Sequence, residues 1–217
     1  MKKALIILSG GLDSTVLAHD IKATGDCDLA AISFDYGQKH TRELDCAAEQ
    51  ANILHIDHRI IALPFINELF ASALLKSGKE LPHGHYEDDN MKQTVVPNRN
   101  MIMLSIAAGV TISQQRVELY YGAHGGDHAI YPDCRPDFVE AMRGALHLCD
   151  WQDIDLKVPY LRDNKEKIVK RGLELGVDFS KTWTCYAGGE QACGSCGSCV
   201  ERAEAFAINN TVDPLLF

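Results

Sequence analysis

A short polar turn after an apolar strand restricts the fold of this chain more than any other sequence feature. The apolar run at residues 4–8 is followed at once by the turn SGGLDST at residues 9–15, and residues 14–23 carry apolar side chains at helical spacing. A glycine-rich turn that leads into a helix presents unpaired backbone N–H groups at the positive end of the helix dipole, which favours an anion. The sequence therefore predicts a phosphate-binding turn at the end of the first strand.

The same order of strand and helix recurs along the chain. We predict further strands at residues 28–34, 53–61 and 116–121, and further helices at residues 41–51, 99–113, 137–148 and 164–175, the last ending at Gly176. This alternation predicts an α/β fold, a Rossmann-like parallel sheet with helices on both faces and ligands at the carboxyl ends of the strands. With 217 residues, 46% of them hydrophobic, the chain is long enough for one sizeable core and a small appendage.

Charge and hydropathy exclude several classes of partner. The formal net charge of −9 provides no basic field for nucleic acid or for an anionic membrane surface. No stretch approaches the roughly 18 apolar residues of a membrane span. Residues 1–8 resemble a signal peptide superficially, but the apolar run is too short and no small-residue cleavage site follows it. We therefore expect a cytoplasmic protein.

Residues 74–93 predict a long polar loop or lid, because they contain glycine and proline and show no clear period. His83 and His85 in this segment are candidates for binding a metal or a substrate. The alternative is that they are solvated histidines of a surface loop.

The turn itself lacks the lysine of a Walker phosphate loop, so an ordinary P-loop NTPase is not expected. Its informative residue is Asp13, because a carboxylate beside phosphates repels them unless a divalent cation lies between. Asp13 is therefore a candidate magnesium ligand. The alternative is a tight strand-to-helix turn in which a serine or the aspartate only caps the helix.

Four of the eight cysteines lie close together near the carboxyl end, with the spacing C-x7-C-x2-C-x2-C. Four thiolates can close a tetrahedral zinc site and leave no position for a reacting ligand, so we predict a structural zinc knuckle within residues 181–217, packed on the domain formed by residues 1–180. An iron–sulfur cluster and free thiols are the alternatives. The proposed ligands are Cys185, Cys193, Cys196 and Cys199.

The segment SGGLDS resembles the PP-loop signature S-G-G-x-D-S of the ATP pyrophosphatases, which have an adenine nucleotide alpha hydrolase-like fold. These enzymes cleave ATP to AMP and pyrophosphate, generally by adenylating a carbonyl or carboxylate oxygen that a nitrogen or sulfur nucleophile then attacks. The resemblance implies that residues 1–180 form the catalytic domain and bind ATP with Mg²⁺. The residues implied are Leu8, Ser9, Gly10, Gly11, Leu12, Asp13, Ser14 and Thr15.

Further motifs narrow the resemblance. FDYGQKH at residues 34–40, VPNRN at 96–100, YPDCR at 131–135 and the four-cysteine pattern together resemble the 7-cyano-7-deazaguanine synthase family, from about residue 3 to residue 202. This resemblance implies a ligase of queuosine and 7-deazaguanine biosynthesis. It converts 7-carboxy-7-deazaguanine and ammonia to the 7-cyano base through an adenylated carboxylate and an adenylated amide. It also implies small-molecule substrates, a homodimer and no direct nucleic-acid partner.

The resemblance also implies roles for single residues. The expected catalytic residues are Asp13, Ser14, Arg99 and Lys165. Arg99 is a candidate for contact with phosphate or carboxylate, because a guanidinium can bind either group bidentately. The residues expected to contact the deazapurine are Asp127, Tyr131, Asp133 and Arg135. An acidic side chain accepts hydrogen bonds from a guanine-like edge. The alternatives are a surface ion pair for Arg99, a solvated helix lysine, and a capped turn at residues 133–135, where Cys134 only packs.

Two departures from the family pattern bear on these roles. Asn98 stands where the family commonly has glycine, and because asparagine tolerates the left-handed conformation we expect the turn to be kept. Ala129 and Ile130 stand where serine and glycine are common, so a related deazaguanine derivative is an alternative substrate.

Two other functions compete with this one. A tRNA-thiolating PP-loop enzyme would want a basic RNA surface and a catalytic cysteine pair outside the knuckle, which the acidic composition does not favour. A non-catalytic zinc-knuckle binding module leaves the SGGLDS turn unexplained.

Overall fold

The computed structural model describes residues 2–81 and 89–216. In these residues, five strands form one sheet in the order β3-β2-β1-β4-β5, and every neighbouring pair is parallel. The predicted parallel α/β sheet is confirmed. The strands are β1 (Lys2–Ile7), β2 (Cys27–Asp35), β3 (Asp57–Ala62), β4 (Glu118–Tyr120) and β5 (Asp155–Lys157).

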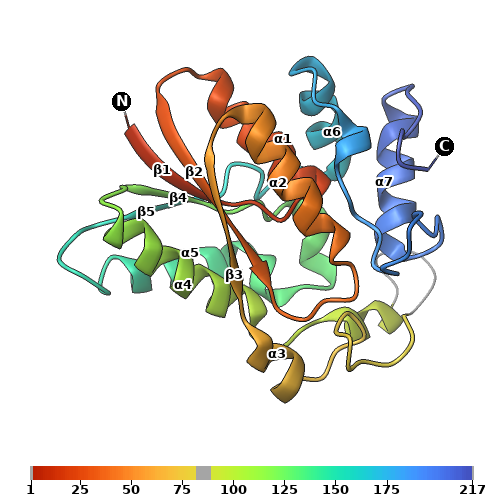
Figure 1. The fold of residues 1–217 in the computed structure, drawn as a ribbon, viewed down its shortest axis with the longest axis horizontal. Coiled ribbons are helices and arrows are strands. Elements are labelled where there is room, and N and C mark those ends of the chain that lie inside the picture. The colour runs from red at the N-terminus through yellow and green to blue at the C-terminus, as the bar shows by residue number, and fades with distance from the viewer. Residues whose placement is uncertain (1, 82–88, 217) are drawn as a thin grey trace.

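Helices cover both faces of the sheet (Figure 1). Helices α1, α2 and α6 pack on one face, and α4 and α5 pack on the other. The chain changes face between β3 and α4, so the strand order reverses next to β1. The helices of the described residues are α1 (Leu12–Ala23), α2 (Arg42–Leu54), α3 (Pro64–Leu69), α4 (Arg99–Ser113), α5 (Pro136–Leu146), α6 (Lys165–Glu174) and α7 (Gly197–Ile208).

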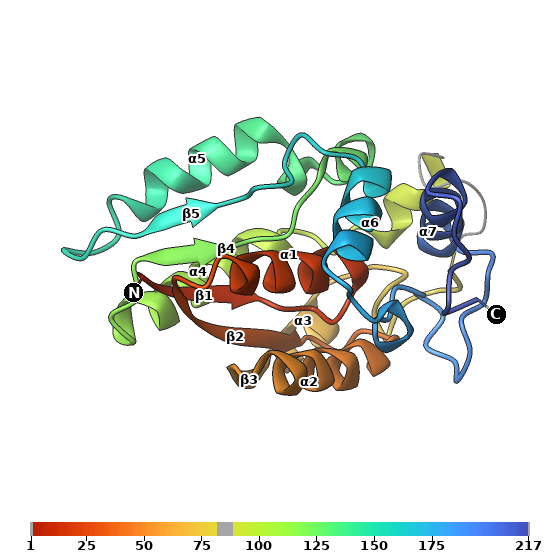
Figure 2. The same cartoon turned by 90° about the horizontal axis from the view of Figure 1, so that it is seen from above.

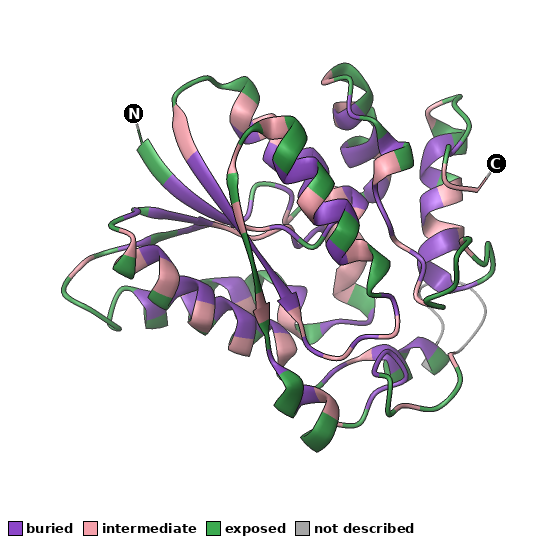
Figure 3. Ribbon diagram, in the orientation of Figure 1, coloured by how far each residue is buried: buried purple, intermediate pink, exposed green. Residues whose placement is uncertain are grey.

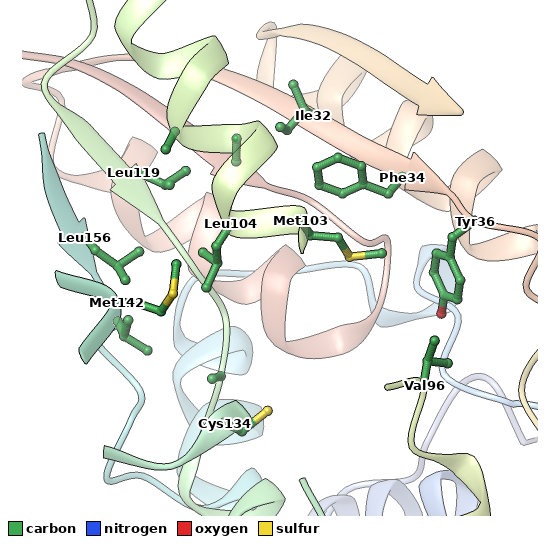
Figure 4. Close-up of a cluster of buried hydrophobic side chains, with 14 of the residues drawn as sticks. Ile32, Phe34, Tyr36, Val96, Met103, Leu104, Leu119, Cys134, Met142 and Leu156 are labelled. Atoms are coloured by element: carbon green, nitrogen blue, oxygen red, sulfur yellow. The ribbon is translucent and has the colours of Figure 1, made fainter. Parts of the chain in front are cut away.

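The core is built by strands that are apolar on both faces, as parallel strands between two helical layers must be. Ile6 of β1 packs beneath α1, whereas its neighbour Leu5 faces α4 on the opposite side. Figure 4 shows the α4 side of the core, where Phe34 of β2 and Leu119 of β4 meet Leu104 of α4. In Figure 3 the buried stripes of the helices accordingly face the sheet.

The third predicted strand, at residues 53–61, was wrong at its beginning. Helix α2 continues through Ile53 to Leu54 and ends at His55, which adopts a left-handed conformation with φ of 52°. Strand β3 begins only at Asp57 and forms an edge of the sheet. A short apolar run has no period that separates a helix end from a strand, so the sequence alone does not reveal the boundary between α2 and β3.

Three elements were not predicted. Helix α3 has only six residues, and strand β5 only three, although Leu156 in β5 is buried. Helix α7 begins inside the cysteine cluster. It lies beyond the carboxyl ends of the strands in both views and packs beside α6 (Figures 1 and 2). Phe206 of α7 contacts Phe179 edge to face, with ring centroids 5.0 Å apart, so α7 shares the core of the sheet's α1 side.

The described part of residues 74–93 is exposed at Lys76, Ser77, Lys79 and Glu80 but buried near its two ends. Leu74 and Leu75 are fully buried, and Leu75 forms an isolated antiparallel bridge with Gln38. A short 3-10 helix spans Asp89–Thr94. The apolar residues at the two ends of the segment anchor it to the core. His83 and His85 lie outside the described residues. Within the described residues, none of the helices has the length and hydropathy to cross a membrane.

Candidate functional site

A cavity of about 210 Å³ opens at the carboxyl ends of the strands, where β1 and β4 diverge. The ends of β1 and β2 and the residues that directly follow β4 supply its floor, and the segments around Arg99, Lys165 and Trp183 supply its walls. In doubly wound sheets the point where the strand order reverses is where ligands bind, because the connections leave it in opposite directions. The cavity is therefore the candidate site.

The SGGLDST turn forms one end of this cavity. Gly10 has a φ of +82°, and an added Cβ there would lie 1.9 Å from the backbone oxygen of Glu43 in α2. Gly11 is the N-cap of α1 and has extended backbone angles. The turn thus packs against α2 at Gly10 and presents Gly11 with the amino end of α1 to the cavity, as an anion site requires.

Two hydroxyl groups of the turn are already joined. The Ser9 and Ser14 Oγ atoms lie 2.9 Å apart, and Ser14 Oγ also accepts a 3.1 Å hydrogen bond from the Ser9 backbone N–H. Both serines line the cavity. Their hydroxyls therefore belong to one small network that faces the cavity.

Four of the predicted ATP-binding residues lie behind the turn rather than on the cavity wall. Leu8 and Leu12 are fully buried in the core, and Gly10 packs closely against the backbone of α2. Thr15 is also fully buried, and its Oγ1 has no hydrogen-bond partner among the described residues. Their direct contact with ATP stays a prediction, whereas their support of the turn is visible.

Asp13 and Lys165 form a buried ion pair at the same end of the cavity. Lys165 Nζ lies 3.0 Å from Asp13 Oδ1 and 2.8 Å from Oδ2. Burial acts to raise the pKa of Asp13, but the charges of Lys165 and His124 outweigh it and hold the pKa below its usual value. The same carboxylate raises the pKa of Lys165 against the effect of its own burial. Lys165 is only 6% exposed, which rules out a solvated helix lysine.

His124 was not predicted as a site residue, yet it completes this cluster. Its Nδ1 accepts a 3.0 Å hydrogen bond from the Gly126 N–H, and its Nε2 lies 3.5 Å from Asp127 and 3.8 Å from Asp13. A neutral imidazole accepts at only one nitrogen. Lys165 Nζ lies 2.8 Å from the same Nε2, so the lysine ammonium and the two carboxylates compete for this ring nitrogen. The only sequence signal was a histidine beside two glycines.

Arg99 lines the middle of the cavity from the first turn of α4. One guanidinium nitrogen donates to the Tyr36 hydroxyl at 3.2 Å, and the guanidinium carbon lies 5.6 Å from the centre of that ring. No carboxylate of the described residues is close enough to Arg99 for an ion pair, so the surface-pair alternative is not supported. Asn98, the N-cap of α4, has a φ of 58°, and the expected left-handed turn is confirmed.

The YPDCR segment contributes differently from the prediction. Tyr131 lines the cavity, as does Asp127 upstream. Asp133 instead accepts a 3.3 Å hydrogen bond from the Asn100 N–H, and so caps α4 from outside. Arg135 is exposed and donates to the His128 carbonyl oxygen. The capped-turn alternative thus describes Asp133, except that it caps α4 rather than the helix that follows it.

His40 of the FDYGQKH segment and Glu43 of α2 also line the cavity, and neither had a predicted role. Gln38 donates to Glu43 at 3.0 Å, and His40 Nε2 lies 3.4 Å from the same carboxyl. Burial raises the pKa of Glu43 to about 8, and burial with the charge of Arg99 lowers the pKa of His40 to about 3. Both groups are therefore neutral near pH 7. The Nδ1 of His40 is buried with no partner among the described residues.

Cys134 also lines the cavity, between the Asn100 amide and the Tyr121 hydroxyl. Burial raises the pKa of its thiol well above the usual value. Reactive cysteines have a lowered pKa, so these surroundings do not favour a nucleophilic thiolate at Cys134.

The four predicted metal ligands come together. Their sulfur atoms all lie within 4.8 Å of one another, a spacing that suits one ion with Zn–S bonds of about 2.3 Å. None of the eight cysteines, all of which lie in the described residues, forms a disulfide. Backbone N–H groups of Ala187 and Cys193 point at the Cys185 sulfur, at 3.4 and 3.3 Å. These donors stabilise a thiolate, so the cluster fits a zinc knuckle.

Comparison with known proteins agrees with this geometry. The family model for the queuosine biosynthesis protein QueC matches residues 3–210, nearly the whole chain. The chain belongs to the QueC family. The match includes the phosphate turn, the cavity walls and the cysteine cluster of this QueC family member.

Similar proteins are related over almost their full length. A protein from Hahella chejuensis is 51% identical over 99% of this chain and 93% of its own length, and is named 7-cyano-7-deazaguanine synthase. A protein of the same name from Methanoregula boonei is 52% identical over 98% of both chains. The chain therefore aligns with both proteins along nearly their whole length.

Two solved structures share the fold at low sequence identity. An NMN synthetase from Francisella tularensis superposes with a TM-score of 0.54 and 15% identity, over 96% of this chain and 77% of its own. A predicted tRNA methyltransferase subunit from Methanocaldococcus jannaschii gives 0.53 and 15%, over 100% of this chain and 92% of its own. At this identity the likeness concerns the fold alone.

Proposed function

We propose that this QueC family member converts 7-carboxy-7-deazaguanine, ammonia and ATP to 7-cyano-7-deazaguanine, AMP and pyrophosphate. The observation that carries the proposal is the identity of about half of all residues, over nearly the whole chain, with proteins named 7-cyano-7-deazaguanine synthase. The cavity at the switch point holds the polar groups that such a ligase needs.

The reaction requires two adenylation steps, one on the carboxylate oxygen and one on the amide oxygen, because neither oxygen leaves readily without activation. The oxygen of a carboxylate leaves badly, so adenylation first gives a mixed anhydride, which ammonia attacks to form the amide and AMP. The amide oxygen then attacks the α-phosphorus of a second ATP. Loss of AMP and of the nitrogen-bound protons gives the nitrile. One cavity serves both steps, because each requires an oxygen held in line with the α-phosphorus and stabilisation of the departing pyrophosphate.

The phosphate end of the cavity accounts for the second requirement. We assign the pyrophosphate to Ser9, Gly11 and Ser14 at the amino end of α1, with Lys165 neutralising its charge. Asp13 lies beside Lys165 and is the carboxylate that would hold Mg²⁺. A bound Mg²⁺ supplies charge neutralisation between phosphate oxygens.

The part of the cavity lined by Tyr36, Tyr121 and Tyr131 suits the planar deazapurine. Arg99 is the group for the substrate carboxylate, since it lines the cavity without a competing ion pair among the described residues. Tyr131 and Asp127 remain the proposed substrate contacts on the β4 side. We give Asp133 the indirect role of holding the first turn of α4, from which Arg99 projects.

The remaining assignments are those of the family resemblance. We propose Zn²⁺ in the four-cysteine site, where it closes the segment that leads into α7. We further propose a cytoplasmic homodimer with no nucleic-acid partner, in keeping with the net charge of −9.

Substrate-dependent pyrophosphate exchange tests the proposal. The zinc-loaded protein should exchange labelled pyrophosphate into ATP only when 7-carboxy-7-deazaguanine is present. Addition of ammonium should then yield AMP and, by mass spectrometry, first the amide and then the nitrile. Neither AMP nor a change in substrate mass from folded, zinc-loaded protein would refute the assigned reaction.

A further inference from the structure

Glu201 connects the cysteine cluster to the phosphate end of the cavity. Helix α7 has Cys196 as its N-cap and carries Cys199 in its first turn, and Glu201 follows two residues later. The Glu201 Oε2 atom lies 3.4 Å from Lys165 Nζ, and the two side chains are 17% and 7% exposed. Helix α7, which begins at the proposed zinc site, therefore carries a side chain that contacts a proposed catalytic lysine.

The orientation of α7 is fixed independently of this contact. Arg202, the next residue, is fully buried and forms a two-pronged ion pair with Asp213, at 2.8 and 2.9 Å. It also donates to Thr182 Oγ1 at 2.7 Å and to the Phe179 carbonyl oxygen at 3.0 Å. With the cysteines on one turn and Arg202 on the next, α7 has little freedom to rotate, so Glu201 is held toward Lys165.

The opposite side of Glu201 is equally restricted. A Cβ at Gly126 would lie 2.7 Å from Glu201 Oε1, so the carboxylate approaches the backbone of the turn that carries His124. His124 is itself 2.8 Å from Lys165. The glycine at position 126 thus leaves the space that the carboxylate uses.

The partners of Lys165 differ in their access to a ligand. Asp13 and Lys165 line the cavity, whereas Glu201 contacts the lysine from behind the cavity wall. An ammonium has three donors, so a phosphate that enters the cavity competes with Asp13 for Lys165 and leaves the contact with Glu201 in place. Without Glu201, the lysine would lose the carboxylate that contacts it from outside the cavity when a phosphate displaces Asp13.

We propose that Glu201 is a positioning residue that holds Lys165 against the cavity wall while ATP displaces the lysine from Asp13. The inference rests on the proposed function only where it names the deazapurine as the substrate that is adenylated. The role of Glu201 in ATP binding does not depend on that substrate. Because α7 starts at the cysteine cluster, the metal knuckle supports the phosphate end of the cavity through this side chain.

A double-mutant cycle between Glu201→Gln and Lys165→Met tests the proposal. Calorimetry would give the Kd for MgATP, and pyrophosphate release would give kcat and the KM of the deazapurine. Glu201→Gln should weaken ATP binding or lower kcat by about tenfold, the effect of losing one charge-assisted contact, with the KM of the deazapurine unchanged. The double variant should lose no more than Lys165→Met alone, and Glu201→Asp should recover part of the loss.

Glu204→Gln is the matched control, because Glu204 lies on the exposed face of the same helix. It should leave ATP binding and kcat at wild-type values. Metal content and melting temperature, measured on every variant, identify any general damage to α7.

Additive losses in the cycle would overturn the proposal, since Glu201 would then act without Lys165. Wild-type ATP binding and kcat in Glu201→Gln would overturn it as well. If the wild-type protein binds ATP but leaves 7-carboxy-7-deazaguanine unchanged, the proposed function fails, and the cycle on ATP affinity still decides the role of Glu201.

Discussion

Replacing Gly10 with alanine tests whether the phosphate turn depends on close packing against α2. An added Cβ would lie 1.9 Å from the Glu43 carbonyl oxygen and 2.7 Å from the Ala47 backbone nitrogen. Both are backbone atoms of a helix, so the clash is relieved only if the turn or the whole first part of α2 moves. The Gly10 carbonyl oxygen also accepts a 2.9 Å hydrogen bond from the Trp183 N–H, which resists that movement.

Two costs add in this variant. A residue with a side chain loses about 1–2 kcal/mol in the left-handed region, and Gly10 has a φ of +82°. Insertion of a methyl group into a closely packed site costs about 1–3 kcal/mol more. The free energy of unfolding should therefore fall by about 2–5 kcal/mol, and for a chain of this size each kcal/mol lowers Tm by about 2–4 °C.

Gly25→Ala is the matched control, because Gly25 has a φ of +73° but no atom within 4 Å of an added Cβ. Its loss should be the left-handed cost alone. Urea unfolding of both variants separates the clash from the backbone cost. Calorimetry with MgATP should show weaker binding only for Gly10→Ala, because Gly11 and Ser9 flank the displaced residue.

Equal destabilisation of the two variants, together with wild-type ATP affinity of Gly10→Ala, would refute this reasoning. The turn would then tolerate a side chain at its closest approach to α2, and the position of Gly11 would not depend on that approach.

Three further perturbations address other parts of the site. Asp13→Asn should lower pyrophosphate release by about a hundredfold or more while metal analysis still finds zinc, and an unchanged rate would remove Asp13 from the reaction. Folded Glu43 keeps its proton to about pH 8, whereas the unfolded chain loses it near 4.5, so this group makes stability fall as pH rises through that interval. The depressed pKa of His40 acts in the opposite sense from about pH 3 to 6.5 and offsets the fall there. Urea unfolding should therefore show a decline of about 1.4 kcal/mol per pH unit from about pH 6.5 to 8 that Glu43→Gln abolishes, and persistence of the decline in that variant would assign it to another group. Chelation of the metal should reduce helical circular dichroism and change the fluorescence of Trp183, which packs against the cysteines, and added zinc should restore both signals. An unaltered spectrum after complete metal removal would contradict a structural metal.

The metal cluster and the phosphate turn could be read from sequence because their chemistry is local. The four cysteines lie within fifteen residues of one another, and the turn joins β1 directly to α1. Asn98 is a third case, since its left-handed conformation follows from the residue type and its place before a helix. The order of strands and helices was likewise visible as a change of period along the chain.

The composition of the cavity wall was not visible in this way. Asp13 and Lys165 are 152 positions apart, and only the packing of α6 against α1 brings their side chains to 2.8 Å. Asp133 is diverted from the cavity because the amino end of α4 lies within its reach. No local pattern distinguishes an aspartate that binds substrate from one that caps a neighbouring helix.

The parallel α/β sheet, the phosphate turn and the grouping of the four cysteines could be predicted, because each depends on residues that are neighbours in the chain. Packing in three dimensions places Glu201 against Lys165, buries His40 and Glu43 in the cavity and leaves Arg135 exposed. Those positions depend on how separate elements pack at the carboxyl edge of the sheet. Burial and charge, and hence the pKa of each group, are set by that packing.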